Sequence, residues 1–401
     1  MEANPETSRP APPGYWSLVA SGEPFRLLFP LGATIGIFGV LLWPLFIWNV
    51  TQGYPGPMHA RIMTEGFLAC FVIGFLGTAL PRLLDVRRMT IWETLTAAAA
   101  LAGIPLLHFF GEAIWGDILF FLLLGGFVLA LGVRFRARKD TPPPAFVLVV
   151  LGLGCALTGS GMLIISQAAP SLSGALQAAA RLLLFQGFVL LPIMGVGAFL
   201  LPRFFGQPSR QVFPESRAIP PGWKPRALFA LACGLAIIGS FLLEAAGEIR
   251  WGMALRAGIV AAFFLREIPL RGPLRAGGSL ALGLRLALLS LVLGYTLMAI
   301  WPERSFSFLH LVFISGFSLL TFIVATRVVF GHGGQSQLFT APLRSIRLLT
   351  ALLVVAMLTR VTADWMPASR MTHYAYAAVG WIAGVLIWVV FILPGVRKAD
   401  E

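Results

Sequence analysis

The sequence has little charge and little cysteine. Only 12% of its 401 residues are charged, whereas 58% are hydrophobic. This composition excludes a water-soluble globular core and indicates a polytopic membrane protein. Three cysteines, Cys70, Cys155 and Cys233, lie singly within apolar runs, and we interpret them as inert buried thiols. The chain also lacks a C-x-x-C pair for zinc, a C-x-x-C-H motif for c-type haem and a G-x-x-x-x-G-K-[ST] phosphate loop.

Apolar runs long enough to cross a bilayer, about 20 residues each, divide the chain. We predict an all-α polytopic membrane protein with about twelve transmembrane helices in a single domain, residues 25–401. The predicted spans are 25–49, 60–82, 91–110, 113–133, 145–168, 176–201, 226–246, 250–268, 279–301, 305–330, 343–363 and 371–396. The eighth is the least typical, because it is short and carries Arg256. Residues 1–24 are polar and proline-rich and do not resemble a signal peptide, so we predict a cytoplasmic N-terminal tail.

Acidic residues are also scarce, 17 against 30 lysines and arginines, which gives a net charge of +13. Most of the basic residues fall in the N-terminal tail, in the links that follow even-numbered spans and at the C-terminus. The positive-inside rule then predicts that both termini are cytoplasmic. We interpret the positive charge as a topology signal, so the expected partner is the lipid bilayer and not nucleic acid.

The chain has five histidines, and the predicted topology puts four of them at the outer face or in the outer half of the membrane. These four are His59, His108, His310 and His373, whereas His332 follows span 10 on the cytoplasmic side. A single histidine near a span end is commonly an interfacial residue with one hydrogen bond. Imidazoles that face one another in a helical bundle instead hold a haem iron or copper. The outer arginines suit haem propionates, and they are Arg61, Arg304, Arg360 and Arg370.

Span 2 also carries an acidic residue. Glu65 lies four residues after Arg61, a spacing at which the two side chains can pair on one helix face. Such a pair either neutralises two buried charges or takes part in proton transfer, because intramembrane ionisable groups are functional candidates. Met63 lies four residues after His59 and is a soft potential metal ligand, although methionine in an apolar span usually serves packing.

A Gly-Phe dipeptide recurs in spans 2, 6 and 10. The three segments are Glu65-Gly66-Phe67, Gln186-Gly187-Phe188 and Ser315-Gly316-Phe317. Spans four apart run in the same direction, so the recurrence favours three repeated units of four helices around an axis normal to the membrane.

Three arcs of four helices resemble the catalytic subunit of haem-copper oxidases and nitric oxide reductases. There, the second and tenth helices supply the two axial ligands of the low-spin haem, and His59 and His310 match by helix number and depth. The resemblance stops short of the binuclear centre, since span 7 has no His-His pair and span 6 has no histidine.

Two motifs resemble the NnrS family more specifically. The first is His-Ala-His-Glu-Met, then Gly-Phe and Gly-Phe-Leu-x-Thr-Ala-x-Pro, and its matching residues are His59, Ala60, Met63, Gly66, Phe67, Gly74, Phe75, Leu76, Thr78, Ala79 and Pro81. The second is a histidine in span 10, then Thr-Arg-Val and Gly-His-x-Gly, matched by His310, Thr326, Arg327, Val328, Gly331, His332 and Gly334. The resemblance implies a bacterial inner-membrane protein that binds haem and copper and acts in the nitric oxide and nitrosative stress response. Arg61 replaces the second histidine of the first motif and Ile62 its glutamate, which weakens the prediction of copper.

Taken together, these observations predict a haem b protein with His59 and His310 as axial ligands and Arg61 or Arg370 on the propionates. Its role would be nitric oxide handling or linked electron transfer, with a haem-dependent oxidoreductase as one form of that role. The other ligand candidates are His373 and His108, with Glu65 as a further candidate. His332 is placed near a quinol or a lipid headgroup. Two alternatives stay open: a transporter without redox metal, and a structural partner subunit of a respiratory complex.

Overall fold

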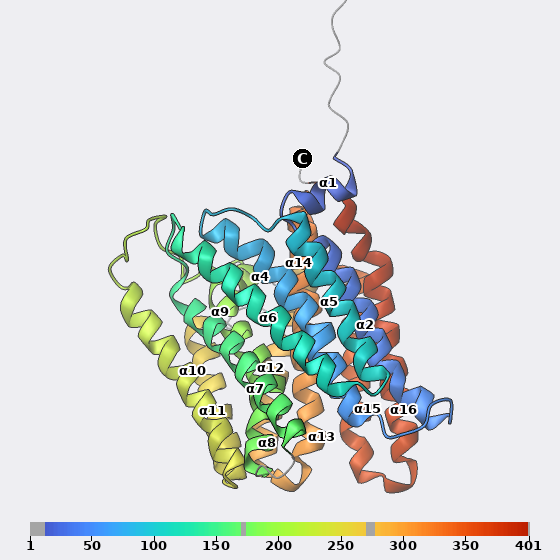
Figure 1. Cartoon of the computed structure of the whole chain (residues 1–401). Coiled ribbons are helices and arrows are strands. Elements are labelled where there is room, and N and C mark those ends of the chain that lie inside the picture. Colours follow the sequence, from blue (N-terminus) through green and yellow to red (C-terminus); the bar gives the residue numbers. More distant parts are fainter. Residues whose placement is uncertain (1–12, 170–173, 270–276, 400–401) are drawn as a thin grey trace, which may run out of the picture.

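The computed structural model describes residues 13–169, 174–269 and 277–399. Within these ranges all regular structure is helical, which confirms the all-α prediction (Figure 1). Eleven helical stretches are long and apolar enough to cross a membrane. They are α2 (Phe25–Ile47); α3 (Gly56–Arg61) with η1 (Ile62–Leu68) and α4 (Ala69–Leu83); α5 (Ile91–Phe109); α6 (Ala113–Arg136); η2 (Pro144–Phe146) with α7 (Val147–Ala168); α8 (Gly174–Arg181) with η3 (Leu182–Gly187), α9 (Phe188–Leu200) and η4 (Leu201–Phe205); α10 (Trp223–Ala245); α12 (Gly278–Ile300); η5 (Pro302–Arg304) with α13 (Ser305–His310), η6 (Leu311–Ser318) and α14 (Leu319–Gly331); α15 (Arg344–Thr362) with η8 (Ala363–Trp365); and η9 (Pro367–Ser369) with α16 (Arg370–Phe391) and η10 (Leu393–Arg397).

The eighth predicted span also forms a helix, α11 (Ile249–Glu267), which packs against α10 and α12. Its 19 residues are long enough for a hydrocarbon core of about 30 Å. It is less apolar than the other eleven because it carries four charged residues, Arg250, Arg256, Arg266 and Glu267. The predicted series of twelve helices is therefore present, with α11 as the polar member.

Both described ends of the chain lie at the same end of the bundle (Figure 1). The short helix α1 (Tyr15–Ala20) lies there, and the Tyr15 hydroxyl donates a hydrogen bond to the carbonyl oxygen of Arg26 at 3.0 Å. The last part of the predicted N-terminal tail thus packs on the bundle, whereas residues 1–12 lie outside the described residues. We call the opposite end of the bundle the distal end.

The structure supports the predicted threefold repeat at the Gly-Phe positions. The described chain has a π-helical segment at each: η1 covers Gly66-Phe67, η3 ends at Gly187, and η6 covers Gly316-Phe317. A π-turn inserts extra backbone into an α-helix and is frequent at functional sites. We name the units by their helices: unit A runs from α2 to α6, unit B from α7 to α11 and unit C from α12 to α16.

The repeat glycines have equivalent packing roles. A Cβ atom on Gly66 would lie 2.6 Å from Ile35 of α2, one on Gly187 would lie 3.0 Å from Cys155 of α7, and one on Gly316 would lie 2.6 Å from Leu291 of α12. Each glycine therefore lets the second span of its unit approach the first span closely.

The three second spans also meet at an apolar cavity of about 80 Å³. Its lining includes the residues four and eight positions after each repeat phenylalanine, namely Phe71, Pro192 and Thr321, and Phe75, Val196 and Ala325. Equivalent positions of three units around one cavity are what an approximate threefold axis requires.

Candidate functional site

The first predicted ligand, His59, lies in α3 at the distal end and is half-buried. Its Nδ1 lies 2.9 Å from the carbonyl oxygen of Gly39 in α2. A carbonyl can only accept, so Nδ1 carries the proton and Nε2 keeps its lone pair. Trp43 of α2 packs edge-on against the ring, with centroids 6.0 Å apart, and it contacts Tyr374 of α16 in the same way at 5.2 Å. The imidazole is thus oriented by α2 and stands beside α16.

The second predicted ligand, His310, is the last residue of α13 and is also half-buried. Its Nδ1 lies 2.9 Å from the carbonyl oxygen of Phe306, one helical turn earlier, so here too Nε2 keeps its lone pair. His310 lies within electrostatic range of both His59 and Arg360. The fold therefore brings the two predicted ligands, 251 positions apart in number, into one region, which we call the distal histidine site.

Arg360 of α15 supplies the positive charge of this site. It is buried, and its guanidinium carbon lies 4.0 Å from the centre of the Tyr374 ring. Among the described residues, neither terminal nitrogen of Arg360 makes a hydrogen bond, although one of them lies 3.9 Å from the Asp364 carboxylate. The sequence placed Arg360 at the right depth but did not single it out from the other outer arginines.

Asp364 of η8 forms hydrogen bonds and an ion pair with several residues around the site. Its carboxylate accepts a hydrogen bond from the Ser307 hydroxyl, and another from the Tyr374 hydroxyl at 3.3 Å. Arg370, a predicted propionate partner, forms an ion pair with it at 3.4 Å. Arg370 therefore stands at the rim of the site, attached to Asp364.

His373 of α16, the main competing ligand, is half-buried and also oriented by its own helix. Its Nδ1 lies 3.0 Å from the carbonyl oxygen of Ser369. The geometry at Nδ1 is thus the same as in His310, and His373 stays a ligand candidate next to Tyr374.

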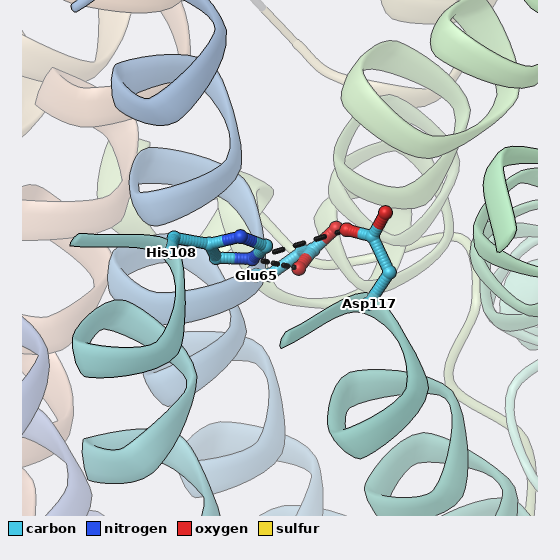
Figure 2. Close-up of side chains that lie close together, drawn as sticks. All are labelled: Glu65, His108 and Asp117. Atoms are coloured by element: carbon cyan, nitrogen blue, oxygen red, sulfur yellow. Dashed lines mark hydrogen bonds and ion pairs between the residues drawn. The ribbon is translucent and has the colours of Figure 1, made fainter. Parts of the chain in front are cut away.

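The other distal candidates form a separate buried group in unit A (Figure 2). Nε2 of His108, at the end of α5, lies 2.9 Å from a carboxylate oxygen of Glu65 in η1 and 3.8 Å from one of Asp117 in α6. Glu65 and Asp117 are 0% exposed and His108 is 3% exposed. The three residues offer ligand atoms within 4.8 Å of one another, so a metal ion and a proton are the two occupants to consider.

Arg61 bonds to Asp117 and not to Glu65, which differs from the predicted pairing. Its Nε and one terminal nitrogen donate to the two Asp117 oxygens at 2.8 and 3.2 Å. The prediction assumed α-helical spacing, whereas Glu65 lies in a π-helical segment, where the i and i+4 positions no longer align. Gln167 of α7 completes the group by donating to Asp117 at 2.5 Å. We call these five residues the unit A cluster.

Asp117 and Gln167 were missed by the sequence reasoning, but a signal for Asp117 exists. The stretch Gly111–Leu119 reads GEAIWGDIL and Gly247–Leu255 reads GEIRWGMAL. Both match G-E-x-x-W-G-x-x-L at the turn between the third and fourth spans of a unit. The shared pattern places Asp117 one residue after the second glycine, at the distal end and against the end of the preceding helix.

Unit B has its own buried cluster at the equivalent place. Arg256 of α11 is fully buried and donates to Ser240 at 3.2 Å, Gln186 at 3.0 Å and Glu244 at 2.6 Å. The Phe241 ring lies 4.3 Å from its guanidinium carbon. The arginine that made the eighth span look unsuitable is therefore hydrogen-bonded to three partners. We call these four polar residues the unit B cluster.

His332 lies at the end of the bundle that carries the termini. Its Nδ1 lies 2.9 Å from the carboxylate of Glu23, and Arg82 contacts both groups. These three residues line a cavity of about 600 Å³ together with Arg26. Burial alone would raise the pKa of Glu23, but the hydrogen bonds and charges of His332 and Arg26 outweigh it and lower the pKa from 4.5 to about 2.

Comparison with known families gives one result for nearly the whole chain. Residues 20–398 match a family described as NnrS protein. No curated protein matches the chain.

Proposed function

The chain belongs to the NnrS family, and from this premise we propose that it is a haem b protein of the bacterial inner membrane that acts in nitric oxide handling. The observation that carries the proposal is the orientation of His59 and His310. Both imidazoles bind a backbone carbonyl through Nδ1, which leaves the Nε2 lone pair for a metal. Histidine ligands in proteins are commonly fixed in this way, because the carbonyl sets both the tautomer and the ring direction.

The charge of the distal histidine site supports an anionic cofactor. Arg360 has two buried terminal nitrogens without a hydrogen bond among the described residues, and it lies within electrostatic range of both histidines. A buried guanidinium favours a carboxylate partner with which it can form charge-assisted hydrogen bonds. Haem propionates supply such carboxylates, so Arg360 joins Arg370 as a proposed propionate partner. Arg61 becomes the weaker one, because Asp117 already binds it.

When bound at this site, haem would supply one-electron redox chemistry. The chain's own residues would hold and tune it: Gly39 and Phe306 fix the two rings, Trp43 orients His59, and Arg360 stabilises negative charge. With both imidazoles on the iron, electron transfer is favoured over binding of a gas ligand. The nitric oxide role rests on the family resemblance, whereas the contacts of His59, His310 and Arg360 support the choice of residues proposed to hold the haem.

The membrane orientation and the electron donor are also proposals. Arg26, Arg82 and Arg88 line the cavity beside His332 at the end that holds both termini, which favours a cytoplasmic location for that end. A quinol or another respiratory donor would reach the protein from the membrane. The polar cavity at Glu23, Arg82 and His332 is a suitable place for such a headgroup.

An optical spectrum of the purified, dithionite-reduced protein tests the proposal. Expressed with adequate haem supply, the protein should show the Soret and α bands of low-spin haem b. His59→Ala and His310→Ala should each abolish the low-spin bands, because each removes an imidazole that would hold the iron. His332→Ala, at the opposite end, is the matched control and should leave them unchanged.

Two results would contradict this proposal. A haem-free protein after expression with excess haem would favour a transporter without redox metal. Loss of the bands in His373→Ala, together with their persistence in His59→Ala or in His310→Ala, would show that His373 is a ligand in place of that member of the proposed pair.

A further inference from the structure

A second site with chemistry of its own lies in the unit A cluster, in the distal half of the bundle. Here Glu65 and His108 face each other across 2.9 Å, and both side chains are buried (Figure 2). One oxygen of Glu65, Oε1, and one nitrogen of His108, Nδ1, are buried without a hydrogen-bond partner among the described residues. Two unpartnered buried atoms in one contact pair need an explanation, since leaving such atoms unmatched costs free energy.

The charges of the cluster divide into two neutral parts. Arg61 binds both oxygens of Asp117, and Gln167 adds a further hydrogen bond to one of them. That ion pair is neutral by itself and needs no contribution from Glu65. The remaining pair, Glu65 and His108, is neutral when it holds one proton, either on the carboxyl group or on the imidazole with the opposite charge left on its partner.

The unpartnered atoms indicate which form is the more stable. A charged carboxylate would leave a buried anionic oxygen unmatched, and an imidazolium would leave a buried N–H unmatched at Nδ1. A protonated Glu65 beside a neutral His108 leaves only uncharged atoms unmatched. The carboxyl O–H donates to Nε2, so the single imidazole proton lies on Nδ1 as a neutral N–H, and Oε1 becomes a neutral acceptor. The same proton can cross the 2.9 Å to Nε2 and return.

We propose that Glu65 and His108 form a buried proton-transfer site beside the Asp117–Arg61 ion pair. The proton moves between Glu65 Oε2 and His108 Nε2. Arg61, which pairs with Asp117, extends from the cluster to the distal surface, with 16% of its side chain exposed.

In the described part of the chain, only a few charged or titratable groups lie close enough to Glu65 to affect proton binding there. Arg61 of α3, His108 of α5 and Asp117 of α6 act on it electrostatically. The first span, α2, packs Ile35 against the neighbouring Gly66, and its single charged residue, Arg26, lies at the opposite end. Proton binding at Glu65 is therefore set by these three distal groups.

A divalent metal ion suits this cluster less well than a proton does. Both Asp117 oxygens are already engaged by Arg61 and Gln167. A metal bound by Glu65, His108 and Asp117 would also stand beside the Arg61 guanidinium and leave the cluster with a net positive charge. Such a charge is expensive in a low-dielectric interior.

Infrared difference spectroscopy on the full chain in lipid nanodiscs tests the proposal, because a protonated carboxyl group has a C=O band separate from the amide bands. Because the favoured form carries a protonated Glu65, lowering the pH from alkaline to neutral should produce one such band, and this band should move to lower frequency in D₂O. Glu65→Gln should abolish it, and His108→Gln should shift its position and midpoint. Glu244→Gln, in the unit B cluster, is the matched control and should leave the band in place. Near-native helix content by circular dichroism shows that each variant is folded.

Two results would overturn the proposal. One is a titrating carboxyl band that Glu65→Gln leaves unchanged. The other is binding of one equivalent of Zn²⁺ or Mn²⁺ that Glu65→Gln removes, which would make the cluster a metal site. If Glu65→Gln does not fold, the effect of His108→Gln on the wild-type band decides between the same outcomes. Neither measurement depends on haem, so failure here leaves the distal histidine site untouched.

Discussion

The two hairpins that share G-E-x-x-W-G-x-x-L have one scaffold but different ionisable residues at equivalent positions. In unit A the residue three positions before the first glycine is His108, and in unit B it is Glu244. The repeat position of the second span is Glu65 in unit A and Gln186 in unit B. Unit B also contains Arg256, which donates hydrogen bonds to three partners. Unit A keeps two unpartnered buried atoms.

This difference indicates a structural role for the unit B cluster and a chemical role for the unit A cluster. Neither Gln186 nor Arg256 exchanges a proton under ordinary conditions, and Arg256 is hydrogen-bonded to three partners. The unit B cluster therefore serves as a structural connection between α8–α9, α10 and α11. The unit A cluster has an acid, an imidazole and open hydrogen-bonding capacity at the equivalent place. Buried polar atoms without partners require an explanation, and intramembrane ionisable groups are functional candidates, so the difference supports the proposed proton-transfer site in unit A.

The largest effect is expected from Arg256→Met in unit B. The substitution leaves Glu244 and Gln186 without their buried partner, and removing one member of a buried pair costs about 3–5 kcal/mol. Thermal and denaturant unfolding, followed by tryptophan fluorescence, measure this loss. The control is Arg250→Met on the same helix, where the side chain is exposed. Equal unfolding midpoints for the two variants would contradict a structural role for the unit B cluster.

The next largest effect is expected from alanine substitutions at the second glycine of each hairpin, Gly252 in unit B and Gly116 in unit A. A Cβ on Gly252 would lie 2.6 Å from the backbone oxygen of Ser240, whereas one on Gly116 would lie 2.6 Å from the His108 ring. Gly252→Ala should therefore lower stability by about 1–3 kcal/mol, because backbone must move. Gly116→Ala should cost less, because a side chain moves, and should perturb the carboxyl band of Glu65. The reverse order of stabilities would show that the hairpins are not equivalent.

The pH dependence of stability also has a contribution from the opposite end of the molecule, at Glu23. The folded-state pKa of Glu23 is lowered from 4.5 to about 2, so its contribution to stability is present above pH 4.5 and is lost as pH falls toward 2. Glu23→Gln should reduce the loss in the free energy of unfolding between pH 4.5 and 2 by an amount on the order of 1 kcal/mol. An unchanged loss would mean that the Glu23 contacts are not maintained in solution.

The smallest effect on stability is expected from Glu65→Gln, which makes unit A resemble unit B at the repeat position. Glutamine can donate to His108 in place of the carboxyl group, so the cost should stay below about 1 kcal/mol. The variant separates the two roles: unfolding is nearly unchanged while the carboxyl band disappears. A large loss of stability would show that Glu65 is a structural charge.

Much of the fold was predictable because apolar length is a direct consequence of bilayer thickness. All twelve predicted spans correspond to helices, and α11 differs only in polarity. The repeat was visible in three Gly-Phe dipeptides. Their π-helical geometry was not, because π-turns depend on packing between helices and carry no period of their own in the sequence.

The distal histidine site was predictable in part. Helix number and depth identified His59 and His310 as candidates, and the structure brings them together. The partners of the charged residues were not predictable, since Arg61 was assigned to Glu65 by helical spacing and instead binds Asp117 of another helix. Selecting Arg360 from several outer arginines likewise required its burial and its missing hydrogen bonds, which are properties of the packed bundle.

The central claim is that His59 and His310 together hold one haem. Near-infrared magnetic circular dichroism of the oxidised protein tests it most directly, since the charge-transfer band of a low-spin haem reports the chemical identity of both axial ligands. The account predicts the band of two neutral imidazoles in the wild type, replaced by a high-spin spectrum or lost in His310→Ala. A bis-imidazole band that persists in both His59→Ala and His310→Ala would contradict it.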